Sequence, residues 1–168
     1  MKKPSMVVLA LSVVPVFAVL AQEPATQRAT LAGLTGVELV VEELNLGVEQ
    51  DGLTRSTLRS DVELKLRQAG IQVLSPTERL ATPGSPYLYL RVSTVKNRVS
   101  IYGYHIAIEL RQLVRLTRDS GVTSWAATWQ SGGIVGTIGA DKLSTTVREN
   151  VQEEVDTFLG AYVAANLK

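Results

Sequence analysis

The chain contains no cysteine and only one histidine among 168 residues, and these scarcities exclude several classes of protein. Without cysteine there is no disulfide scaffold, no thiolate zinc site and no lipid-bearing cysteine of the bacterial lipoprotein kind. With one histidine, a metal site would consist mostly of carboxylates, and the acidic residues lack the spacing of a calcium-binding loop. We therefore expect no metal, no cofactor and a fold held together by its apolar core.

An excess of charge of one sign is also lacking. The chain carries 17 basic and 16 acidic residues, which are interspersed along its length. Proteins that bind nucleic acid need a clustered basic surface, and no such cluster is present. We therefore expect no nucleic-acid partner.

The first 21 residues have the pattern of a secretory signal peptide. A cationic start at positions 2 and 3 precedes an apolar run from Met6 to Leu20, and the small residues Ala18 and Ala21 come before the polar Gln22. At ~1.5 Å per residue this run is well short of a hydrocarbon core of ~30 Å, so an uncleaved membrane anchor is the weaker alternative. We expect cleavage after Ala21 and a periplasmic or secreted protein without a stable membrane span.

Hydrophobic periodicity predicts one α/β domain at residues 31–168, after a disordered lead-in at 22–30. The expected elements are a strand at 37–42, a helix from Thr54 to about Ala69, a short strand at 71–74, a brief helix after Ser75, strands at 87–95, 102–116 and 122–130, and a closing helix from Asp141 or Ser144 to about Ala165. We expect an α+β two-layer sandwich: a mixed, mostly antiparallel sheet of about five strands, with two main helices on one face.

No catalytic motif is present in the sequence. There is no Gly-x-Ser-x-Gly elbow and no cysteine nucleophile, and the neighbouring carboxylates at 42–43 and 153–154 point apart. His105 could serve as a general base, but Glu109 on the same face of its strand would lie ~13 Å away. We assign no catalytic residue, and the alternative is a hydrolase of unrecognised type that uses His105 with carboxylates from elsewhere in the fold.

The segment from Ser131 to Gly139 contains four glycines in nine residues. It lies between a predicted strand and a predicted helix, where backbone amides could meet an anion, but it lacks the Lys-Ser/Thr ending of a phosphate-binding loop. We expect a mobile connection here, with a small-ligand site as a third and weaker function.

Trp125 and Trp129 are four positions apart in a predicted strand, which places both indoles on one face with Ala127 between them. That face either packs against the helices or stays uncovered, where the two indoles would form an aromatic patch with Tyr87 and Tyr89. Exposed tryptophan and tyrosine commonly anchor partners. We therefore nominate Trp125, Trp129, Tyr87 and Tyr89 as partner-binding residues.

The stretch Asp61–Ser75, together with the predicted element order, resembles small exported bacterial domains. It is similar in layout to the amino-terminal domain of TolB and to LpoB-type cell-envelope activators, in which a helix ending in Ala-Gly-Ile precedes a short strand. The resemblance covers most of residues 31–165, but the chain has neither a lipoprotein cysteine nor a propeller, so no functional residue is transferred.

From these features we expect an exported, non-catalytic binding or adapter module of the bacterial cell envelope, which recognises a protein or an envelope component. An uncovered edge strand would also permit a homodimer.

Overall fold

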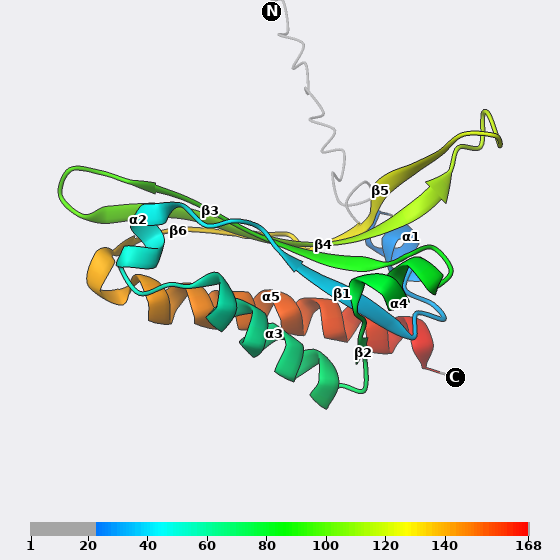
Figure 1. Cartoon of the computed structure of the whole chain (residues 1–168), viewed down its shortest axis with the longest axis horizontal. Coiled ribbons are helices and arrows are strands. Elements are labelled where there is room, and N and C mark those ends of the chain that lie inside the picture. The colour runs from blue at the N-terminus through cyan, green and yellow to red at the C-terminus, as the bar shows by residue number, and fades with distance from the viewer. Residues whose placement is uncertain (1–22, 168) are drawn as a thin grey trace, which may run out of the picture.

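The computed structural model describes residues 23–167 (Figure 1), so the predicted signal peptide at 1–21 lies outside the described residues. In chain order the elements are α1 (Glu23–Ala29), β1 (Gly36–Val41), α2 (Leu46–Gln50), α3 (Arg55–Gln68), β2 (Gln72–Val73), α4 (Pro76–Ala81), β3 (Tyr87–Lys96), β4 (Ile101–Arg115), β5 (Thr123–Gln130), β6 (Ile134–Gly139), the short 3-10 helix η2 (Ala140–Lys142) and α5 (Leu143–Asn166).

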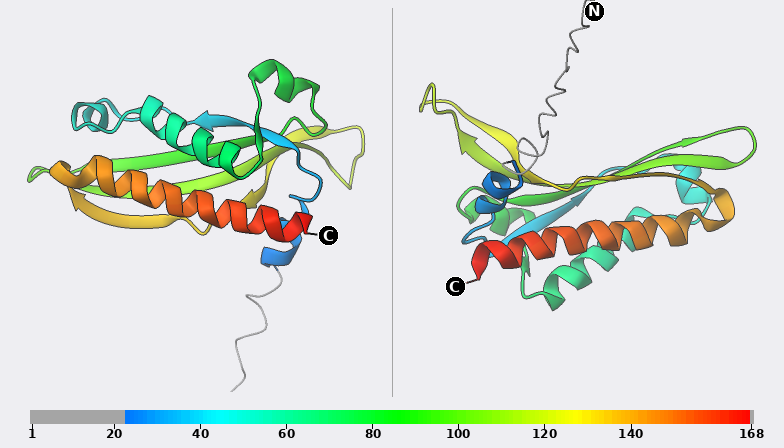
Figure 2. Two further views of the ribbon diagram at one scale, coloured as in Figure 1. Left: turned by 90° about the horizontal axis from the view of Figure 1, so that it is seen from below. Right: turned by 180° about the vertical axis from the view of Figure 1, so that it is seen from behind.

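The strands form one mixed sheet in the order β2-β1-β3-β4, and the far edge of β4 is shared between β5 and β6. β1 runs parallel to β2 and to β3, while β4 is antiparallel to β3, β5 and β6. The two long helices, α3 and α5, lie side by side on one face of this sheet (Figures 1 and 2). The predicted two-layer α+β fold is therefore confirmed.

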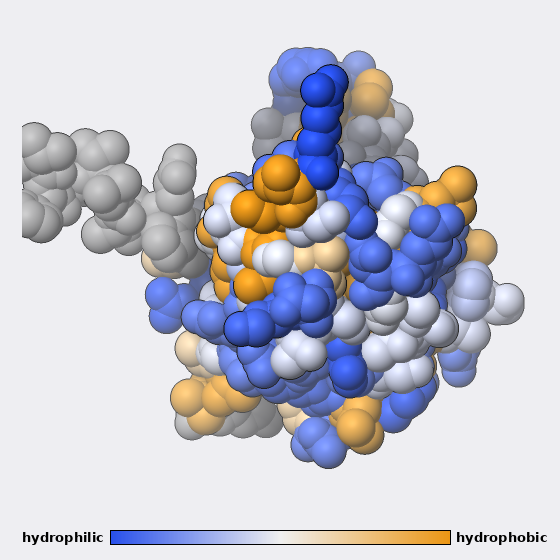
Figure 3. Space-filling view, turned by 90° about the vertical axis from the view of Figure 1, so that its left-hand side faces the viewer, coloured by the Kyte–Doolittle hydropathy of each residue, from blue (hydrophilic) through white to orange (hydrophobic). Residues whose placement is uncertain are grey.

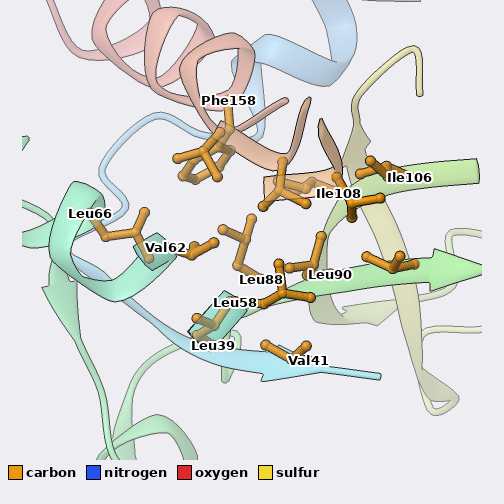
Figure 4. Close-up of a cluster of buried hydrophobic side chains, with 14 of the residues drawn as sticks. Leu39, Val41, Leu58, Val62, Leu66, Leu88, Leu90, Ile106, Ile108 and Phe158 are labelled. Atoms are coloured by element: carbon orange, nitrogen blue, oxygen red, sulfur yellow. The ribbon is translucent and has the colours of Figure 1, made fainter. Parts of the chain in front are cut away.

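Alternation along the strands and three-to-four spacing along the helices create the core. The inner face of β4 buries Tyr102, Tyr104, Ile106, Ile108 and Leu110. Figure 4 shows α3 and α5 placing their apolar stripes against the same layer. Each fully buried Leu, Ile, Val or Phe contributes about 1.5–3 kcal/mol from loss of water contact, so this single cluster supplies the main stabilisation of the fold.

Local capping signals in the sequence set the ends of two helices. The Thr54 side chain accepts the backbone N–H of Thr57 at the start of α3, and Gly70 follows that helix with a φ of +79°. At α4, Ser75 and Glu78 bond reciprocally as a capping box. These short-range patterns predict helix ends reliably because both partners lie within one turn of the chain.

Residues 23–29 form helix α1, where the sequence predicted a disordered lead-in. The Gln27 side chain accepts the backbone N–H of Gln130 at 3.3 Å, and the Thr30 hydroxyl donates to the Thr128 carbonyl at 3.1 Å. Leu31, which follows, is fully buried. A seven-residue helix is marginal by itself, so this one depends on contacts with residues about 100 positions away that local sequence cannot reveal.

The glycine-rich segment forms a strand rather than the expected mobile connection. β6 pairs with the first half of β4, and Tyr104 lies directly opposite Gly136. A Cβ at Gly136 would lie 2.4 Å from the Tyr104 hydroxyl, which also accepts a hydrogen bond from Asn150 of α5 at 2.8 Å. Glycine at this position thus lets the Tyr104 ring lie across β6 and reach the helix layer.

Replacing Gly136 with alanine should lower the free energy of unfolding by about 1–3 kcal/mol, because the buried Tyr104 ring would have to move. Urea denaturation measures this change. The matched control is G160A in α5, where a Cβ meets open space and alanine should stabilise the helix by about 0.5–1 kcal/mol. Equal effects of the two substitutions would contradict the packing described for Tyr104.

One polar cluster joins α2 to the β3–β4 hairpin at the far end of the molecule. The buried hydroxyl of Tyr102 and the Lys96 ammonium both donate to Asp51, each at 2.7 Å. Lys96 and then Tyr102 hold the pKa of Asp51 below its ordinary value of 3.8. Around this cluster the exposed apolar side chains form small groups separated by hydrophilic ones (Figure 3). Asp51, the C-cap of α2, thus joins this helix to the hairpin together with the contact of the Tyr102 hydroxyl with the Gly47 carbonyl.

Substituting Asp51 with asparagine should reduce the acid sensitivity of unfolding. Because the folded-state pKa of Asp51 is lowered, its carboxylate stabilises the fold above pH 3.8, and this contribution is lost as the pH falls through the lowered value. Unfolding midpoints measured from neutral pH downward should thus decline less steeply in D51N than in the wild type. E49Q, which changes an exposed acid of the same helix, should follow the wild type.

Candidate functional site on the open face of the sheet

The face of the sheet opposite α3 and α5 has no layer of helices over it in residues 23–167 (Figure 2). Strand alternation sends a second set of side chains to this open face, and they are polar and aromatic rather than aliphatic. From β1, β3, β4 and β5 they include Glu38, Val40, Glu42, Tyr87, Tyr89, Arg91, Glu109, Arg111, Leu113 and Trp125. Helix α4 borders this face through Arg79.

A β-bulge decides which tryptophan reaches the open face. Leu110 pairs with Trp129, but the next residue, Arg111, pairs with Ala127, so Thr128 is an extra residue in β5. The prediction that both indoles share one face is wrong, because this insertion breaks the alternation between them. Trp129 is 5% exposed and packs against Phe158 in the core, whereas Trp125 is 42% exposed and packs edge-on against Tyr87 at 5.4 Å.

The bulge also shapes the surface. Bulged strands bend, and beyond this point the β4–β5 hairpin turns away from the helix layer (Figures 1 and 2). The bend and α4 enclose a shallow pocket of about 310 Å³, lined by Glu38, Val40, Arg79, Tyr87, Tyr89 and Trp125. This pocket contains three of the four nominated partner-binding residues; Trp129 is not accessible there.

Arg79 lies inside this pocket. Its Nε donates to Glu38 at 2.5 Å, and both side chains are mostly buried, with 18% and 16% exposed. The centre of the guanidinium group lies 5.1 Å from the Trp125 ring and 5.5 Å from the Tyr87 ring. A cation held against two aromatic faces and one carboxylate has the contacts of a cation–π site.

A second arginine cluster adjoins the pocket on β3 and β4. Arg111 makes two contacts with Glu109, at 2.7 and 2.8 Å, and stacks over Tyr89 at 4.5 Å; the bond to Glu109 raises the pKa of Arg111. Burial, followed by a hydrogen bond to Glu42, raises the pKa of Tyr89. Arg91 approaches Glu109 at 3.5 Å, and its buried Nε has no hydrogen-bond partner. The Tyr89 ring and the Arg111 guanidinium group are therefore held in place by their neighbours.

His105 also lies on the open face, in register with Val135 of β6. Glu109, the acid on the same strand face, is engaged by Arg91 and Arg111 and does not orient His105. In the part of the chain that the structure describes, no group of three His, Cys, Asp or Glu residues could hold a metal ion. The geometry around His105 thus offers no general base positioned by a carboxylate.

A larger groove of about 520 Å³ lies between α1, α5 and the end of β5. Its α5 side consists of small residues, Thr157, Gly160, Ala161 and Ala164, and Trp129 forms part of its floor. Arg28 is its one ionisable lining residue, whereas the smaller pocket brings the two charged side chains Glu38 and Arg79 together with three aromatic rings. Convergent polar and aromatic groups are what give a site specificity, so we favour the open-face pocket as the functional site.

Arg79, Glu38, Arg91 and Arg111 were not nominated from the sequence. Arg79 and Glu38 are 41 positions apart and meet only when α4 is placed beside β1. The signal for three of them was strand alternation. Glu38, Arg91 and Arg111 each follow a buried residue in their strand, so their side chains point to the opposite face of the sheet.

A scan against protein-family models found no family that matches the chain, and a search of curated proteins found no relative. Among solved structures, a candidate lipoprotein from Caulobacter crescentus CB15 aligns with 83% of this chain and 96% of its own, at 13% identity and a TM-score of 0.27. A TM-score of 0.27 is too low to support a conclusion about this chain. The resemblance to TolB and LpoB-type proteins is not shown by these comparisons. None of the helices between residues 23 and 167 combines the length and apolar character needed to cross a membrane.

Acrylamide quenching of tryptophan fluorescence should come from Trp125 alone. In W125F the remaining Trp129 is buried against Phe158, so quenching should fall sharply and emission should move to shorter wavelength. W129F is the matched control and should retain the quenching of the wild type. Strong quenching in W125F would show that Trp129 reaches solvent and that the bulge is misplaced.

Proposed function

We propose that this protein is an exported, non-catalytic binding module of the bacterial cell envelope, and that the open face of its sheet recognises a protein or envelope component. The observation that supports the proposal is the pocket in which Tyr87, Tyr89 and Trp125 surround Arg79 on an uncovered face. The three rings of this group lie outside the core cluster, which is on the opposite face of the sheet.

The composition of the open face suits recognition. Tyrosine, tryptophan and arginine are the side chains that most often dominate the energy of protein interfaces. Here Arg111 is held by its ion pair with Glu109 and by its contact with the Tyr89 ring, so little of its side-chain entropy is lost when a partner binds. Leu113 and Trp125, both 42% exposed, add apolar area beside the pocket.

The proposed location comes from the amino-terminal pattern of residues 1–21. An exported chain without cysteine cannot depend on disulfides, and the continuous core supplies stability instead. The absence of a positioned acid beside His105 makes a hydrolase the less favoured function.

Site-specific photo-crosslinking tests the proposal. A benzoylphenylalanine at position 113, next to Trp125 on the open face, should crosslink a partner from the envelope fraction of the source cells. The matched probe at position 64 replaces Leu64, which is 56% exposed on the helix layer, and should give little of the same product. Adding W125A to the position-113 probe should reduce the product roughly tenfold, as expected for loss of an interface anchor.

Two results would contradict the proposal. The first is a partner captured equally from positions 113 and 64, because the open face would then have no special role. The second is a position-113 product unchanged by W125A.

A further inference from the structure

Helix α4 is attached to the rest of the molecule without burying a side chain in the core. Its six residues contribute no buried side chain to the core, and Leu80 is exposed. Among residues 75–83, Arg79 and Thr82 are the ones partly shielded from solvent. The hydrogen bonds of Thr82 are local: it donates to the carbonyls of Glu78 and Arg79 and accepts the backbone N–H of Ser85. Arg79, through Glu38, Tyr87 and Trp125, is therefore the main contact of α4 with the sheet.

The chain on either side of α4 is anchored independently. Before it, the Leu74 N–H donates to the Val37 carbonyl at 2.8 Å; after it, the Leu113 N–H donates to the Gly84 carbonyl at 2.8 Å. Because these bonds do not involve α4, the helix can leave the pocket without opening the core. Segments with few buried apolar contacts open at low free-energy cost.

We propose that the pocket between Tyr87 and Trp125 is a binding site for a cationic side chain of a partner polypeptide, an arginine in particular, and that Arg79 occupies it as an internal ligand that the partner displaces. This inference rests on the proposed function of the open face and names the chemistry that the face recognises.

The charge of the pocket supports a cationic occupant. Once Arg79 withdraws, the lining keeps the carboxylate of Glu38 beside the rings of Tyr87, Tyr89 and Trp125. Arg111 lies over Tyr89 but pairs with Glu109, so the Glu38 carboxylate can accept another cation. A carboxylate beside aromatic rings favours a cationic group. Arginine suits it better than lysine, because a planar guanidinium can stack on aromatic rings and bond the carboxylate at once.

Displacement also accounts for the burial of the pair. A partner that brings its own arginine exchanges one Glu38 ion pair for another, so the net cost of opening the site is small. The apparent affinity for the external ligand is the intrinsic affinity multiplied by the fraction of time that Arg79 leaves the pocket empty. Removing Arg79 should therefore strengthen binding of a guanidinium ligand, which is the opposite of what a structural arginine predicts.

The test uses the capped tripeptide acetyl-Gly-Arg-Gly-amide and its citrulline analogue, which has the same shape without the charge. R79A should bind the arginine peptide at least about tenfold more tightly than the wild type, measured by titration of Trp125 fluorescence. The citrulline peptide should not bind, and R79A combined with W125A, followed by NMR shifts, should lose binding. R98A removes an exposed arginine of the hairpin turn and should behave as the wild type.

Equal affinity of R79A and wild type, or equal binding of the citrulline peptide, would overturn the inference. If R79A fails to fold, hydrogen exchange of the wild-type protein decides the question: the arginine peptide at high concentration should speed exchange at residues 75–83, and unchanged exchange there rejects displacement. Crosslinking from position 113 that survives these negative results would leave the proposed function standing, with a partner of different chemistry.

Discussion

The structure depends on one long strand, β4, which takes part in each antiparallel pairing of the described sheet. Along one edge it pairs with the whole of β3, and along the other it is divided between β6 and β5. Its inner side chains contact α5, and its outer ones carry Glu109 and Arg111. Alternation along β4, clearest from Tyr102 to Leu110, therefore determines both the core and the open face, and a slip of one register position would exchange the two.

The sequence predicted those features in which the interacting residues are close in the chain. Thr54, Gly70 and the Ser75–Glu78 capping box all lie within a turn of the helix ends they define, and the two-layer fold followed from the resulting element order. It did not predict α1 or β6, because each is stabilised by partners far away in the chain, such as Thr128 for the residues after α1 and Tyr104 for β6.

The residues of the site also divide into those that the sequence predicts and those that it does not. Tyr87, Tyr89 and Trp125 were nominated because residue type and alternation pointed to them, and the structure brings them to one pocket. Trp129 was assigned the same face because alternation was taken to be unbroken, and no local signal identified Thr128 as the bulge. Arg79 was not nominated because a single arginine in a short helix has no pattern that separates it from a solvated surface residue.

The two faces of the sheet are held by interactions of different kinds. On the inner face, stabilisation comes from apolar area removed from water, which is lost if any large side chain withdraws. On the open face, arginines, carboxylates and aromatic rings contact one another, and the Arg79–Glu38 pair, although mostly shielded from solvent, is held by charge rather than by apolar area. A pair such as Arg79–Glu38 can therefore be exchanged for an equivalent one while the core stays intact.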